Sequence, residues 1–137
     1  MLSKFDLIQK ILAIYKAKLP QPEAEWPNEV QRAVRYIHEH LFHPVLSIRR
    51  VKEQCRINGS HFSTIFSHYL GQTPKQYIQK HRLEAAKRLL DDQSLQKLSI
   101  TQIALSLGYS GKGTFNHAFR KQEGITPGQW QKNKEIW

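Results

Sequence analysis

The chain has 137 residues, of which 39% are hydrophobic, enough for one modest domain or for two very small units that share a connector. A chain of this size leaves little room for a large catalytic cleft. Its 21 Lys and Arg against 11 Asp and Glu give a formal charge of +10, which favours an anionic partner such as nucleic acid or an acidic membrane surface.

The first predicted element is a helix from Ser3 to about Lys18, because apolar side chains recur there at steps of three and four residues. Prolines at positions 20 and 22 end this helix, and we place a boundary near residue 25, so that residues 1–25 form an N-terminal helical extension. The apolar face is broad and needs a partner. It could pack back on the rest of the chain, pair with a second copy, or be the stub of a removed sensor domain, and we favour one of the last two. The apolar residues are Phe5, Leu7, Ile8, Ile11, Leu12, Ile14 and Tyr15.

A second helix is predicted from about Asn28 to Leu41, where the dipeptide His43-Pro44 ends it. Val30, Val34, Ile37 and Leu41 are its expected inward residues. Beyond this helix the chain becomes strongly basic. Residues 46–137 hold fifteen basic and six acidic side chains, so nine of the ten excess positive charges lie there.

An internal repeat occupies residues 46–74 and 98–127. Both copies begin with Leu-Ser-Ile and end with the pattern Phe-x3-Phe-x4-Gly-x-Thr-Pro, and each predicts two short helices that meet steeply at a turn. In the second copy we expect Gly108 to supply the left-handed turn residue and Ser110 to cap the next helix. Small Ala104 lets the two helices approach closely. The expected inward residues are Ile100, Ile103, Ala104, Leu107, Phe115 and Phe119.

The first copy follows the same outline, with Asn58-Gly59-Ser60 predicted as turn and cap. It departs at two positions, because Lys52 stands in place of Ala104 and Arg56 in place of Gly108. We expect the stem of Lys52 to lie along apolar surface with its ammonium pointing outward, and the packing to be looser. The expected inward residues are Ile48, Val51, Cys55, Ile57, Phe62, Ile65, Phe66 and either Tyr69 or Leu70.

Between the two copies, Thr73 is the predicted cap and Pro74 the first residue of a long helix that reaches about Leu90. At 1.5 Å per residue this helix spans roughly 25 Å. Adjacent major-groove segments on one face of DNA lie about 34 Å apart. A connector of this length is therefore compatible with one chain that reads two consecutive grooves.

These motifs resemble those of the AraC/XylS family of transcription regulators. The similarity is closest from Ser99 to Pro127 and covers roughly residues 28–131, although Trp130 is followed by Gln131 where the family usually has an arginine. Arg82-Leu83, Ala86 and Leu89-Leu90 match the family's linker helix. The resemblance implies an all-α fold with residues 26–137 as the DNA-binding domain. The implied DNA-binding domain contains two helix-turn-helix subdomains, which are homeodomain-like three-helix units at about 46–71 and 99–123. The linker helix at 74–90 joins them.

The resemblance implies a sequence-specific DNA-binding protein that controls transcription initiation. Its implied partners are double-stranded promoter DNA and RNA polymerase. A homodimer through the N-terminal helix, or through a missing sensor domain, stays open. A second interpretation within the same class is an effector-free regulator that is complete at this length.

Base recognition by a helix-turn-helix uses the outward face of the second helix, chiefly its N-terminal half. Asn can bind adenine bidentately and Lys or Arg can bind guanine, whereas short hydroxyl side chains read bases weakly or through water. We therefore expect the second copy to supply more of the direct specificity. The base-reading candidates are Ser60, His61, Ser63, Thr64 and Ser67 in the first copy and Lys112, Gly113, Asn116, His117 and Arg120 in the second.

Four further residues are candidates for phosphate contacts, which set the register of the protein on DNA and make binding depend on salt. Solvation near a helix end is the simpler interpretation for Arg120 and Lys121. The phosphate candidates are Arg49, Lys80, Thr101 and Lys121.

Two other classes of function compete with this interpretation: a nonspecific nucleic-acid packaging protein, and a DNA-repair protein that carries a similar helical module. Repair would require an activated cysteine, and the single cysteine, Cys55, lies on an expected inward face. No catalytic set, metal site or cofactor motif is recognisable, and the seven histidines lack ligand spacing. We expect a non-enzyme in the cytoplasm, because there is no disulfide pair, signal peptide or long apolar run.

Overall fold

The computed structural model describes residues 3–136, and every regular element in this range is helical. The predicted all-α class is therefore confirmed. Two elements were not predicted, the short 3-10 helix η1 and the last helix α8. In chain order the elements are α1 (Lys4–Ala17), α2 (Asn28–Glu39), α3 (Ile48–Gln54), α4 (Phe62–Leu70), α5 (Pro74–Asp91), η1 (Gln93–Leu95), α6 (Ile100–Ser106), α7 (Lys112–Glu123) and α8 (Pro127–Ile136).

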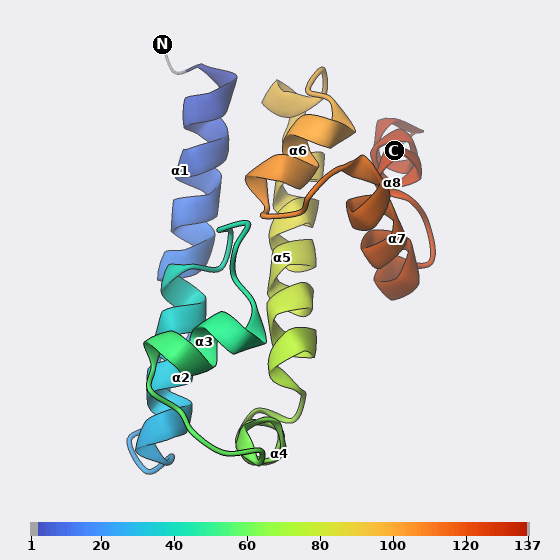
Figure 1. The fold of residues 1–137 in the computed structure, drawn as a ribbon. Helices are drawn as coiled ribbons and strands as arrows, with labels where there is room; N and C mark the ends of the chain where they lie inside the picture. The colour runs from blue at the N-terminus through green and yellow to red at the C-terminus, as the bar shows by residue number, and fades with distance from the viewer. Residues whose placement is uncertain (1–2, 137) are drawn as a thin grey trace.

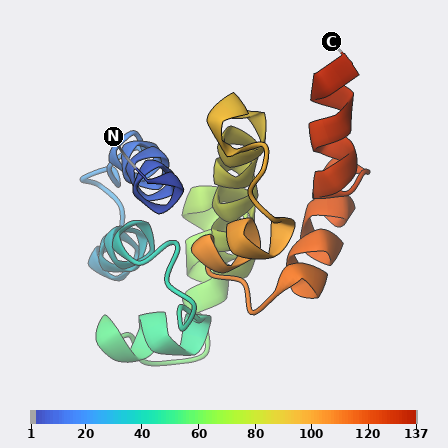
Figure 2. The ribbon, with the colours of Figure 1, turned by 90° about the horizontal axis from the view of Figure 1, so that it is seen from above.

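Helix α5 is the central strut of the molecule, with α1 and α2 on one side and α7 and α8 on the other (Figures 1 and 2). It begins as predicted: the hydroxyl of Thr73 accepts the backbone N–H of Gln76, and the Gln76 side chain accepts the N–H of Thr73. Pro74 is the first helical residue, where its missing N–H costs nothing. At 1.5 Å per residue, its 18 residues span about 27 Å.

Two hydrophobic cores lie along this strut. The first, built by α2, α3, α4 and the start of α5, surrounds Phe66, Ile37 and Val51. The second, built by the end of α5 with α6 and α7, surrounds Phe115 and Phe119. Because α5 contributes buried side chains to both cores, it fixes each three-helix unit to one rigid element.

Helix α1 packs back on the rest of the chain, which is the interpretation that the sequence did not favour. Ile8 and Leu12 are buried in the second core. The following segment is also held, because Leu19 joins the first core and Pro22 is buried. Not all of the broad face is covered: Phe5 is 66% exposed and Ile14 44%.

The repeat extends beyond the two short helices. Gly71 and Gly124 end α4 and α7 in left-handed conformations, with φ of 77° and 85°. Each of these glycines is followed by a Thr-Pro pair that starts the next helix. An aromatic residue on that helix packs back on the second phenylalanine of the copy. Tyr77 packs on Phe66 and Trp130 on Phe119, with ring centroids 5.7 and 5.8 Å apart. Helix α8 thus caps the second unit as the start of α5 caps the first.

A buried arginine joins the two units. Arg82 of α5 is 8% exposed, and its guanidinium donates hydrogen bonds to the carbonyl oxygens of Leu41 (2.8 Å) and His43 (2.9 Å) in the segment that leads into α3. The same guanidinium lies over the ring of Tyr109 in the turn between α6 and α7, 5.6 Å from its centroid. One side chain therefore ties the entrance of the first helix-turn-helix to the turn of the second.

Candidate nucleic-acid interface

The turn of the second copy has the predicted backbone, and the first copy makes a left-handed turn at an arginine, which the sequence did not predict. Gly108 has φ 97°, as expected for the left-handed turn residue, and Arg56 at the equivalent position has φ 54°. The ammonium of Lys52 lies at the surface, where it donates a hydrogen bond to the carbonyl of Gly59 (2.8 Å). This contact ties α3 of the first copy to its own turn.

The predicted helix caps were wrong in both copies. Helix α7 begins at Lys112, so its capping position is Gly111, and the hydroxyl of Ser110 instead lies 3.3 Å from that of Thr114. Helix α4 begins at Phe62, so its capping position is His61 and not Ser60. Neither capping residue makes a side-chain hydrogen bond to its helix. The backbone N–H groups at both helix starts are therefore left to other partners.

We call α4 and α7, the second helices of the two copies, the reader helices; α4 has 9 residues and α7 has 12. When the two copies are aligned on their phenylalanine pairs, Ser63, Thr64 and Ser67 correspond to Asn116, His117 and Arg120. Residues 112–114 are helical in α7, whereas the equivalent residues 59–61 lie before α4. The outward face of α7 consequently extends further toward its N-terminus.

The base-reading candidates lie on the two reader helices or, for Ser60 and His61, just before α4. Two of them are partly buried: Asn116, and Ser67, whose hydroxyl donates to the backbone carbonyl of Ser63 (2.7 Å). The exposed candidates are Ser60, His61, Ser63 and Thr64 in the first copy and Lys112, Gly113, His117 and Arg120 in the second.

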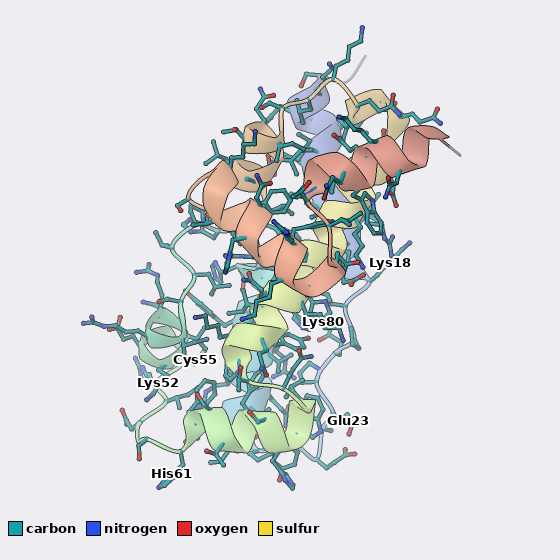
Figure 3. All side chains as sticks on the ribbon, turned by 90° about the vertical axis from the view of Figure 1, so that its right-hand side faces the viewer. Lys18, Glu23, Lys52, Cys55, His61 and Lys80 are labelled. Carbon is teal, nitrogen blue, oxygen red and sulfur yellow. The ribbon has the colours of Figure 1, made fainter. Side chains whose placement is uncertain are left out.

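Figure 3 shows that α4 and α7 both begin on the same side of the molecule, at the left of that view, and both run rightward across the direction of α5. His61, at the start of α4, and Lys52, on α3, lie on this side. The N-terminal ends of the two helices therefore face the same way. We call this side of the molecule the reader side.

The four phosphate candidates do not form one cluster. Arg49 pairs with Glu53 (3.0 Å), and Thr101 is exposed on the first turn of α6. Lys80 and Lys121 line a groove of about 870 Å³ between α5 and α7, near the C-terminal ends of α4 and α7. This groove also contains Lys75, which the sequence reasoning missed because nothing in the repeat sets it apart.

Two hydrogen-bonded Tyr–His pairs lie partly buried along α5. The hydroxyl of Tyr77 lies 2.6 Å from Nε2 of His38, and that of Tyr15 lies 2.7 Å from Nδ1 of His81. Burial lowers the pKa of His38 to about 4 and raises that of Tyr77 to about 12, so neutral rings and protonated phenols are the stable partners. These pairs fasten α1 and α2 to α5.

The single cysteine, on which the DNA-repair alternative depends, lies in an unreactive environment. Cys55 is buried, its thiol lies 3.6 Å from the carbonyl of Arg32, and burial raises the pKa of this thiol, which disfavours the reactive thiolate. Within residues 3–136, no three His, Cys, Asp or Glu side chains are grouped so that they could hold a metal ion. In the same range, no helix is both long and apolar enough to cross a lipid bilayer.

Comparison with known proteins gives consistent matches. A family model described as a helix-turn-helix domain matches residues 51–133. The HTH-type transcriptional regulator AlkR of Acinetobacter baylyi is 33% identical over 128 residues, which are 86% of this chain and 40% of the relative. The XylDLEGF operon transcriptional activator of Pseudomonas putida is 33% identical over 97 residues, 71% of this chain and 30% of the relative. The chain thus spans less than half the length of these curated relatives.

Solved structures share the fold. The C-terminal domain of AraT, a response regulator from Geobacillus stearothermophilus, superposes with a TM-score of 0.71 at 29% identity, covering 80% of this chain and 88% of that one. The DNA-binding domain of the global transcriptional factor AdpA, solved in complex with a target DNA, gives a TM-score of 0.69 at 20% identity, covering 80% and 96%. At 20% identity the second likeness concerns the fold alone.

Proposed function

The chain belongs to the AraC/XylS family of helix-turn-helix proteins, and from this premise we propose that it binds double-stranded promoter DNA sequence-specifically and regulates transcription. One arrangement carries the proposal: two reader helices whose N-terminal ends share one side of the molecule, mounted on a strut buried in both cores. Helices held in this way can enter two consecutive major-groove segments of one duplex.

The two helices would contribute differently to recognition. On α7, Asn116 has the donor and acceptor pair that adenine requires, and Lys112 or Arg120 can bind guanine. The α4 positions that align with Asn116 and Arg120 are Ser63 and Ser67, whose hydroxyl groups discriminate between bases weakly, and Lys112 aligns with Gly59 ahead of α4. Most of the direct base recognition would therefore come from α7, while α4 fixes the register.

The further partners belong to the same proposal. A regulator bound at a promoter acts on RNA polymerase, which we take as the second partner, and the cytoplasm as the site of action. Helix α1 buries Ile8 and Leu12 within its own chain, so a homodimer through this helix could use only what remains exposed, chiefly Phe5 and Ile14.

The test is selection of bound duplexes from a random pool. We expect an enriched site with two conserved blocks whose centres lie about 10 base pairs apart, one helical turn. Recovery of duplexes without any shared sequence would contradict sequence-specific binding and favour the nonspecific packaging alternative.

Substitutions on α7 test which residues read the bases. Asn116→Ala or Lys112→Ala should reduce the preference for the selected duplex over random DNA by about 1–3 kcal/mol, because each removes a contact to a base edge. Titrations of both duplexes at one salt concentration measure this preference. Gln122→Ala, an exposed amide near the other end of the same helix, is the matched control and should leave the preference unchanged. Equal weakening on both duplexes would remove Asn116 and Lys112 from the base-reading set.

A further inference from the structure

Arg56 holds a backbone conformation that its residue type rarely adopts. Its φ of 54° is the one positive value at a non-glycine residue in the described part of the chain. For a residue with a Cβ this conformation is strained, whereas glycine adopts it readily. The second copy has glycine at the equivalent position, Gly108. The first copy therefore keeps a strained arginine where the same turn can be made by glycine.

No hydrogen bond or ion pair of the Arg56 side chain within residues 3–136 offsets this backbone strain. The residue is exposed, and among residues 3–136 no carboxylate pairs with it and no side-chain hydrogen bond holds its guanidinium. It lines an open hollow of about 680 Å³ together with Arg49 and Lys52. The carboxylate of that hollow, Glu53, is already paired with Arg49. The charged side chains that line the hollow therefore sum to a net positive charge, and the guanidinium of Arg56 has no carboxylate partner among residues 3–136.

The position of this hollow relates it to the reader helices. Arg56 precedes the first residue of α4 by six positions and lies on the turn between Lys52 and His61. Both of these residues lie on the reader side in Figure 3. A ligand bound in the hollow would therefore sit beside the end of α4 that enters the major groove.

We propose that Arg56 binds a phosphate group of the DNA backbone beside the first helix-turn-helix, and that the strained turn is retained for this contact. The inference rests on the proposed DNA-binding function and adds to it a residue that is not among the base-reading or phosphate candidates. A planar guanidinium with no carboxylate partner is well suited to a phosphate, which it can bind through two parallel hydrogen bonds.

Arg56→Gly is the test, because stability and binding should change independently. The thermal midpoint of unfolding should stay the same or rise, since glycine relieves the strain. At 0.15 M salt the Kd should rise by roughly 3- to 10-fold, on selected and random duplexes alike, and the slope of log K against log salt should fall by about 1. A lower thermal midpoint would overturn the idea that the strain is kept for binding.

Two further variants complete the experiment. Arg56→Lys keeps the charge and the Cβ, so it should retain most of the salt slope. Lys10→Gln removes one charge from an exposed position on α1 and should leave the slope nearly unchanged. A slope for Arg56→Gly that matches the wild type or Lys10→Gln would overturn the phosphate contact. If the wild-type chain showed no preference for the selected duplex over random DNA, the proposed sequence-specific function would be contradicted. The test of Arg56 would still stand, because the salt slope can be measured on random DNA.

Discussion

At the scale of single residues, the two turns show how one backbone requirement is met in different ways. Both need a left-handed residue, and the second copy places Gly108 there because no side chain fits. A Cβ on Gly108 would lie 2.7 Å from a guanidinium nitrogen of Arg82 and 3.1 Å from the carbonyl of Phe42. In the first copy Arg56 takes the equivalent position, and the nearby turn glycine, Gly59, stands in open space, since a Cβ there would meet nothing within 4 Å.

This difference predicts unequal costs for the same substitution. Gly59 and Gly108 have nearly identical φ values, 96° and 97°, so alanine should cost about 1–2 kcal/mol of backbone strain at either. Gly108→Ala must also displace the hydrogen-bonded guanidinium of Arg82, which adds about 1–3 kcal/mol. Urea unfolding of both variants measures the difference. Equal losses of stability at the two positions would show that the contact with Arg82 carries no energy.

At the scale of elements, α1 is the helix whose role the structure changes most. The sequence showed a broad apolar face, and the structure divides it into a buried stripe at Ile8 and Leu12 and an exposed edge at Phe5 and Ile14. The bond between Tyr15 and His81 and the hydrogen bond from Lys16 to the backbone carbonyl of Glu39 (3.0 Å) hold its second half. Helix α1 is therefore part of the folded unit.

Alanine substitutions at one buried and one exposed residue of α1 test how its apolar face is divided between core and solvent. Leu12→Ala opens a cavity in the second core and should cost about 2–4 kcal/mol of unfolding free energy. Phe5→Ala removes a larger side chain that is mostly in solvent, and should cost less than about 0.5 kcal/mol. Denaturant unfolding at low protein concentration gives both values. If Leu12→Ala proved as mild as Phe5→Ala, α1 would not be docked in solution.

At the scale of the whole molecule, the orientation of one helix-turn-helix relative to the other depends on α5 and on Arg82. Helix α5 belongs to both cores, and Arg82 reaches from it to the segment before α3 and to the turn before α7. This arrangement sets the angle and distance between the reader helices, and with them the separation of DNA blocks that the protein can bind at once.

Arg82→Met should therefore affect stability and spacing together. It leaves the carbonyl oxygens of Leu41 and His43 without their donor, at a cost of about 2–3 kcal/mol. It should also reduce the penalty that the wild type shows when one base pair is inserted between the two conserved blocks. Unfolding curves and binding to duplexes with normal and lengthened spacing test both effects. The control is Arg88→Met at an exposed position on the same helix. A spacing penalty that is the same in wild type and Arg82→Met would show that Arg82 stabilises the fold without setting the geometry.

The sequence by itself determined the helical class, the two-copy organisation, the start of α5 at Thr73-Pro74 and the left-handed turn at Gly108. These features are encoded within short windows, by apolar periodicity, capping boxes and glycine's conformational freedom. It did not determine the helix starts at Lys112 and Phe62, the docking of α1, the capping role of α8 or the partners of Arg82. The docking of α1 and the partners of Arg82 depend on contacts between residues tens of positions apart, where several local solutions are equally good and only the burial of shared surface in three dimensions selects one.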